Sequence, residues 1–184
     1  GEKDPFVRAG GPCAYNVEPI ADFLDFVVLG EGEEVIHEII DTVKKAKEQG
    51  LSRRDTLVQL SRLGGVYVPS FYEAEYDADG KFAAMRVLEP GAPAVITKRV
   101  VKDLSKTEYP DKFVVPYVDV VHDRVMVEVL RGCTRGCRFC QAGMIYRPVR
   151  ERDPELLKQQ IRRLVESTGY DEISLTSLSS GDYT

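Results

Sequence analysis

Three cysteines, Cys133, Cys137 and Cys140, lie within eight residues of one another and directly follow a valine-rich run. Thiolates are ligands of both zinc ions and iron–sulfur clusters. A structural zinc ion takes four protein ligands, whereas three thiolates on a four-iron cluster leave one iron open to bind a substrate or cofactor. The C-x-x-x-C-x-x-C spacing therefore favours a redox-active 4Fe–4S cluster over a zinc site or a disulfide.

A structural or interaction module that binds zinc or a cluster without catalysis is the alternative function, and its zinc-binding form needs a fourth ligand. The only thiol and imidazoles left for that place are those of Cys13, His37 and His122. Cys13 is expected to be a small buried residue, and His37 to lie on the surface of a helix. His122 precedes a strand, where we expect either a structural hydrogen bond or a contact at an interface or with a substrate.

Glycines and arginines surround the three cysteines. Gly132 and Gly136 tolerate positive φ, so the backbone can curl around a cluster, and its N–H groups can donate to the cluster sulfides. Arg131, Arg135 and Arg138 either bring positive charge close to an anionic cluster or form a solvated surface.

With Phe139 before the last cysteine, the loop resembles that of the radical S-adenosylmethionine (SAM) superfamily, whose pattern is C-x-x-x-C-x-aromatic-C. The resemblance implies an enzyme in which the amino and carboxylate groups of SAM chelate the open iron. One electron from the cluster cleaves SAM to methionine and a 5′-deoxyadenosyl radical, which abstracts hydrogen from a substrate. The resemblance also implies that Phe139 packs near the adenine, whereas an aromatic residue of the core is the alternative.

A second resemblance follows the next expected strand, at Ser179, Ser180, Gly181 and Asp182. Members of the superfamily carry two small residues and an acid there, often Gly-Gly-Glu, which bind the amino group of SAM. This chain has serines and an aspartate instead, and the Asp182 carboxylate can accept hydrogen bonds from an ammonium. A polar turn after a strand is the other interpretation.

Longer stretches resemble one subgroup, the largely uncharacterised iron–sulfur oxidoreductases with an N-terminal cobalamin-binding-like domain. These stretches are residues 10–12, 30–33 and the long run 121–152. The axial-histidine motif of cobalamin-binding members, D-x-H-x-x-G, does not occur in the sequence, so cobalamin binding stays open. The resemblance implies a methyl- or methylthio-transferring enzyme that receives electrons from a donor such as flavodoxin or ferredoxin and acts on an unknown substrate.

The elements expected around these motifs give an α/β fold in three zones. Residues 1–50 resemble the C-terminal part of a Rossmann-like, cobalamin-binding-like domain, and residues 51–120 a connecting region with a β-hairpin. Residues 121–184 resemble the first βαβ unit of a radical SAM partial TIM barrel. Because one such unit leaves strand edges unpaired, the chain is expected to be an internal fragment. A radical must be sheltered from solvent, so we expect activity from the parent protein and none from the fragment alone.

Hydrophobic patterning places the individual elements. In the first two zones it predicts strands at 6–9 and 25–29, a helix at 52–63, extended runs at 66–68 and 71–76, and a hairpin turn at 77–81 that returns through 82–88. Residues 30–34 are expected to turn into a further helix, which Gly50 closes and whose apolar stripe consists of Val35, Ile36, Ile39, Ile40 and Val43. In the third zone it predicts strands at 124–130 and 172–178. Between them it predicts a helix with Asp153 as its N-cap and Pro154 at its first position, which ends at Gly169.

The composition, the N-terminal sequence and the clustered cysteines lead us to expect a cytoplasmic protein. The chain is 43% hydrophobic and 30% charged with a net charge of −5, which fits a packed core and argues against a protein that coats nucleic acid. No apolar run approaches the roughly 18 residues of a membrane span, and the N-terminus lacks a signal-peptide core. Clustered cysteines fit metal binding in a reducing compartment.

Overall fold

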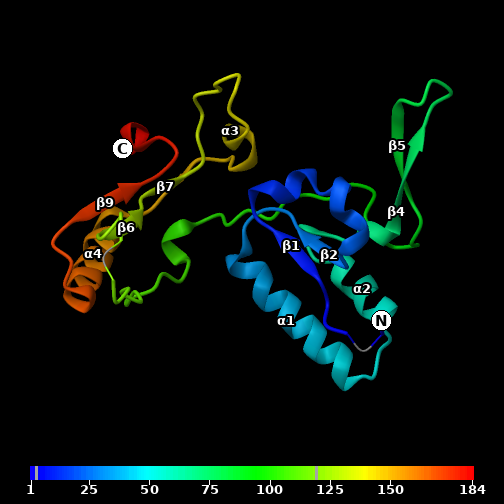
Figure 1. The fold of residues 1–184 in the computed structure, drawn as a ribbon, viewed down its shortest axis with the longest axis horizontal. Helices are drawn as coiled ribbons and strands as arrows, with labels where there is room; N and C mark the ends of the chain where they lie inside the picture. The colour runs from blue at the N-terminus through cyan, green and yellow to red at the C-terminus, as the bar shows by residue number, and fades with distance from the viewer. Residues whose placement is uncertain (3, 119) are drawn as a thin grey trace. The chain divides into compact units, whose positions relative to one another are not determined.

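The computed structural model describes residues 1–2, 4–118 and 120–184. The chain divides into two compact units, Gly1–Val100 and Val101–Thr184, and each is described by itself (Figure 1). Both units combine helices with short strands, so the predicted mixed α/β class is confirmed. Compact units need not coincide with functional domains, and the domain boundaries at residues 50 and 120 stay a prediction.

The first unit is built on a three-stranded sheet in the order β1-β2-β3. The buried central strand β2 (Phe26–Val28) pairs in parallel with β1 (Arg8–Gly10) and antiparallel with β3 (Val66–Tyr67). β1 starts two residues later than predicted. The reason is that the Val7 N–H donates to the Asp25 carboxylate at 2.7 Å instead of joining the ladder.

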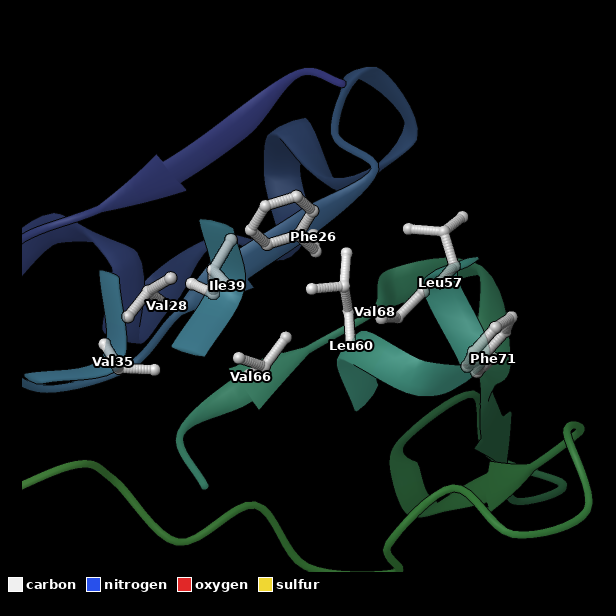
Figure 2. Packing of buried hydrophobic residues seen from close by; sticks show 9 residues of the cluster. All are labelled: Phe26, Val28, Val35, Ile39, Leu57, Leu60, Val66, Val68 and Phe71. Carbon is white, nitrogen blue, oxygen red and sulfur yellow. The ribbon is translucent and has the colours of Figure 1, made fainter. Parts of the chain in front are cut away.

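Two helices complete the core of this unit, α1 (Gly32–Glu48) and α2 (Arg53–Ser61). The predicted stripe of α1 faces inward through Val35 and Ile39, whereas Ile40 lies at its edge and is 42% exposed. Figure 2 shows side chains from both helices meeting those of the sheet. The cluster consists of Phe26, Val28, Val35, Ile39, Leu57, Leu60, Val66, Val68 and Phe71.

The predicted hairpin is present as β4 (Tyr72–Tyr76) and β5 (Phe82–Val87). Its turn is held by the Asp77 carboxylate, which accepts from the N–H groups of Asp79 and Lys81 at 2.9 Å. Short 3-10 helices fill the remaining connections at η1 (Pro12–Asn16), η2 (Glu18–Phe23) and η3 (Pro69–Phe71). Cys13 lies on η1 and is exposed, so its predicted burial is wrong; on this helix Ala14 faces the interior instead.

The second unit contains the predicted pair of parallel strands joined through a helix. β6 (Val125–Glu128) lies beside β9 (Ile173–Thr176), in a register that opposes Val125 to Ile173 and Glu128 to Thr176. Helix α4 (Pro154–Thr168) lies between them in the chain and covers the pair. Its buried residues Leu157 and Leu164 pack against the inward-facing valines of β6.

A second, smaller ladder interrupts this βαβ unit and was not predicted. The strand expected at 124–130 divides at Val129 into β6 and β7 (Leu130–Arg131), and β7 pairs antiparallel with β8 (Arg150–Glu151). Val129 serves both ladders, because its N–H donates to Thr176 O and its carbonyl accepts from Arg152 N. Helix α3 (Ala142–Ile145) and the 3-10 helices η4 (Leu104–Lys106) and η5 (Ser180–Asp182) complete the unit.

Across residues 1–2, 4–118 and 120–184, every helix is too short or too polar to cross a bilayer.

The N-cap of α4 gives a test of how the second unit is stabilised. The Asp153 carboxylate accepts from Glu155 N at 3.0 Å and from Leu156 N at 2.9 Å. Replacing Asp153 with alanine should lower the free energy of unfolding by about 1 kcal/mol, measured by urea denaturation. Asp153→Ser keeps an acceptor and should restore most of the loss. An equal loss in both variants would contradict the capping role.

Candidate functional site

The carboxyl ends of β6 and β9 border an open pocket of about 310 Å³. Active sites of α/β folds and barrels lie at this end of parallel strands. Glu128 closes β6 and Thr176 closes β9, so both strands deliver their next residues to the pocket. Its lining residues are Glu128, Leu130, Arg131, Gly132, Tyr146, Thr176, Ser177 and Leu178.

The cysteine loop begins at this pocket. The β7–β8 ladder forms a neck that pairs Leu130 with Glu151 and Arg131 with Arg150, and residues 132–149 leave and return through it. Gly132 has φ +96°. A Cβ atom there would lie 2.7 Å from Pro148 O and 2.8 Å from Tyr146 O. The start of the cysteine loop therefore packs directly against the backbone that returns to the neck, and only glycine fits.

The three cysteines are all unbridged and reach solvent. Cys137 is exposed, whereas Cys133 and Cys140 are half-buried. A turn brings the last two close along the chain, because Cys140 N donates to Cys137 O at 3.0 Å. Within the described ranges, no three side chains of His, Cys, Asp or Glu gather closely enough to hold a metal ion. The thiols are thus on one loop but do not form a preassembled cage.

The chemistry of this donor set fits an iron–sulfur cluster. Three accessible thiols lie on a single short loop, and thiolates are the ligands of iron–sulfur clusters. Little of the loop is fixed by packing, since residues 134–139 are exposed. The residues therefore suit a 4Fe–4S cluster in type and number, and cluster binding would have to gather their sulfur atoms.

Phe139 is 92% exposed, which excludes the alternative that it is a core residue of this unit. Met144 on α3 is 64% exposed. An exposed aromatic face beside the cysteines remains available to pack on an apolar or aromatic ligand.

An ion pair joins the cysteine loop to the segment that follows β9. Arg135 donates from Nε to Asp182 Oδ2 at 2.9 Å and from Nη2 to Asp182 Oδ1. Ser179 Oγ also donates to Asp182 Oδ2, at 2.7 Å. Hydrogen bonds from Ser179 and Arg135 lower the pKa of the Asp182 carboxyl below its ordinary value of 3.8. The two segments singled out in the sequence are therefore brought together, and Asp182 is a carboxylate at neutral pH.

The remaining residues of the second segment have local roles. Ser180 shares a hydrogen bond of 2.8 Å with Ser177, whose hydroxyl also accepts from Ser179 N at 3.1 Å. Gly181 is exposed, with open space where a Cβ would stand. These contacts form a polar turn on η5 that holds Asp182 towards Arg135.

The lowered pKa of Asp182 can be measured by following its carboxyl carbon in an NMR titration. Its midpoint should lie below 3.8 in the wild type and should rise in Arg135→Gln, because one of the two stabilising donors is lost. Stability contributed by this carboxylate is present above the unfolded pKa and is lost as pH falls through the folded one. A midpoint unchanged by Arg135→Gln would contradict the ion pair.

The other loop arginines differ in their surroundings. Arg131 forms a two-point contact with Glu128, from Nε to Oε1 at 3.0 Å and from Nη2 to Oε2 at 2.8 Å. Arg138 is exposed. His122 and His37 are exposed as well, and the surface position predicted for His37 is confirmed.

Arg152 is a structural residue of this site that the sequence did not single out. It is 3% exposed, and its guanidinium donates to Leu104 O at 2.7 Å and to Thr107 Oγ1 at 3.1 Å. It lies 5.1 Å from the ring centroid of Tyr109. Arg152 thereby ties the neck of the cysteine loop to the segment after residue 101. A charged residue next to a helix cap gives no sequence signal of burial.

Two protein families match the chain. The family described as radical SAM proteins, N-terminal, matches residues 1–69, and the radical SAM superfamily matches residues 127–183. The second match contains all three cysteines and the segment from Ser179 to Asp182. The superfamily expected from the cysteine loop is thus confirmed. No solved structure is a significant match.

Two relatives are similar over part of their length. An uncharacterized protein of Methanocaldococcus jannaschii is 26% identical over 187 residues, which cover 95% of this chain and 32% of that protein. The threonylcarbamoyladenosine tRNA methylthiotransferase MtaB of Bacillus subtilis is 29% identical over 93 residues, which cover 50% of this chain and 18% of that protein. The chain therefore spans about a third of the first relative and under a fifth of the second.

Proposed function

Starting from a chain that belongs to the radical SAM superfamily, we propose that Cys133, Cys137 and Cys140 hold a 4Fe–4S cluster whose fourth iron binds SAM. The whole protein is then an enzyme that cleaves SAM reductively. In this proposal Asp182 accepts from the amino group of SAM, with Ser179, Ser180 and Gly181 forming the turn that presents it. Phe139 offers its exposed face to the adenine.

The observation that carries this proposal is the ion pair between Arg135 and Asp182. It places the carboxylate that would receive the SAM ammonium beside the loop that would hold the cluster. Both lie beyond the carboxyl ends of parallel strands, next to the pocket that Glu128 and Thr176 border. Two motifs whose contacting residues lie 47 positions apart thus meet at the carboxyl end of the strands, where α/β folds bind their ligands.

When bound, a reduced 4Fe–4S cluster supplies the electron that cleaves the sulfonium of SAM and leaves methionine and a 5′-deoxyadenosyl radical. The residues of this chain would bind the cluster and orient SAM. The thiolates fix the position of the open iron, Asp182 neutralises the ammonium, and Arg131 and Arg152 hold the neck through Glu128 and Leu104. Shelter from water would come from further parts of the whole protein.

Methylthio or methyl transfer is the finer part of the proposal. It is supported by the name of the Bacillus subtilis relative, a tRNA methylthiotransferase that is 29% identical over 93 residues. The electron would come from a donor such as flavodoxin or ferredoxin. Cobalamin binding by the first zone is a separate proposal that rests only on the resemblance of residues 10–12 and 30–33.

Metal content after anaerobic reconstitution tests the proposal against a zinc module. With iron, sulfide and zinc all supplied, the protein should take up iron and inorganic sulfide, about four of each per chain. It should become brown. A colourless protein that holds one zinc ion would replace the proposed enzyme with a structural module.

A further inference from the structure

The pair formed by Arg135 and Asp182 matches the amino-acid end of SAM. An α-amino acid carries an ammonium and a carboxylate on one carbon atom, and the pair offers one acceptor and one donor in direct contact. The guanidinium of Arg135 is built for two-point binding of a carboxylate, and it already binds Asp182 in that way.

Arg135 lies on the loop that would hold the cluster, close to where the SAM carboxylate would bind the open iron. Arg135 lies between Cys133 and Cys137, two residues from each, so it belongs to the loop that would hold the open iron. A carboxylate that coordinates that iron through one oxygen has its second oxygen left to accept from a neighbouring guanidinium.

The contacts of Arg135 and Asp182 allow their ion pair to open, so that each residue can bind a group of SAM instead. The Arg135 side chain is 61% exposed and that of Asp182 is 29% exposed, and an exposed ion pair contributes little stability. Asp182 keeps a second donor in Ser179 Oγ at 2.7 Å, so it stays oriented when Arg135 moves away.

We infer that Arg135 binds the carboxylate of SAM, and that the Arg135–Asp182 ion pair of the free chain is exchanged for two ion pairs with the SAM zwitterion. This inference rests on the proposed function. It makes Arg135 a cofactor-binding residue and distinguishes it from a residue that only pins two loops together.

Comparing the binding of SAM with that of decarboxylated SAM shows whether Arg135 binds the SAM carboxylate or only joins two loops. Affinities are measured by equilibrium dialysis on the reconstituted protein with its cluster kept oxidised, so that no SAM is cleaved. Arg135→Gln should reduce the preference for SAM over decarboxylated SAM by about tenfold, the lower end of what a hydrogen bond to a charged group contributes. Chelation of the iron by the SAM carboxylate contributes equally to this preference in the wild type and in Arg135→Gln. It therefore cancels when the preferences of the two proteins are divided.

Two further variants control this measurement. Arg135→Lys keeps the charge and should recover part of the preference, whereas Arg138→Gln removes an exposed arginine of the same loop and should leave the preference unchanged. If Arg135→Gln weakens both ligands equally, Arg135 is only a structural pin and the inference is wrong while the proposed function stands. A wild-type protein that takes up a cluster but no SAM, or no cluster at all, overturns both.

Discussion

Replacing Cys137 with alanine should abolish cluster assembly. Cys137 is the exposed middle member of the trio, and two thiolates cannot hold three corners of a cubane. Iron content after anaerobic reconstitution should fall from about four atoms per chain to near zero. SAM binding should fall with it, because the open iron is lost. Cys133→Ala and Cys140→Ala should behave in the same way.

The remaining candidate metal ligands of the chain provide a matched control. Cys13 is also an exposed free thiol, and a variant in which Cys13, His37 and His122 are all replaced should keep its full iron content. Loss of metal from this triple variant would favour the zinc module, which draws its fourth ligand from these residues. Retention of iron in Cys137→Ala would show that the three cysteines do not act as one ligand set.

Replacing Gly132 with alanine should destabilise the second unit by roughly 3 kcal/mol or more. Gly132 has φ +96°, and its added methyl would meet Pro148 O, Tyr146 O and Val149 Cα within 2.9 Å. These are backbone atoms, and two of them, Pro148 O and Tyr146 O, accept hydrogen bonds from the Arg150 side chain, so they cannot move aside as the end of a flexible side chain could. Urea denaturation measures the loss, and iron uptake should fall as well because the cysteine loop starts here.

Gly136→Ala provides the comparison for this effect. Gly136 also has positive φ, at +66°, but the nearest atom to its added methyl is Thr134 O at 4.0 Å. It should lose only the roughly 1–2 kcal/mol that a left-handed conformation costs an L-residue. Equal losses at the two positions would mean that close packing at the neck does not contribute.

The sequence predicts best those elements whose signals are local. The cap and first residue of α4 were specified by Asp153 and Pro154, and its end by Gly169, which has φ +77°. The turn at 77–81 is held by the Asp77 carboxylate, which accepts from the backbone N–H groups of Asp79 and Lys81 within the same turn. The parallel pairing of β6 with β9 followed from strand, helix and strand in succession.

Elements that depend on distant contacts were missed. Nothing in the valine run divides it at Val129, because the division arises from two hydrogen bonds to Thr176 and Arg152. The ion pair between Arg135 and Asp182 joins residues 47 positions apart, and charged residues so far apart in the chain carry no pairing signal. Cys13 was placed in the interior on its residue type alone, whereas its position on η1 turns it outward.

Electron paramagnetic resonance of the reduced protein, recorded with and without SAM, tests the central claim most directly. Reduced protein should give the signal of a 4Fe–4S cluster, and SAM should change that signal because it binds the iron that no cysteine holds. The same experiment on Cys137→Ala should give no cluster signal. A cluster signal that SAM leaves unchanged would contradict an open iron, and a reduced protein without any cluster signal would contradict the site itself.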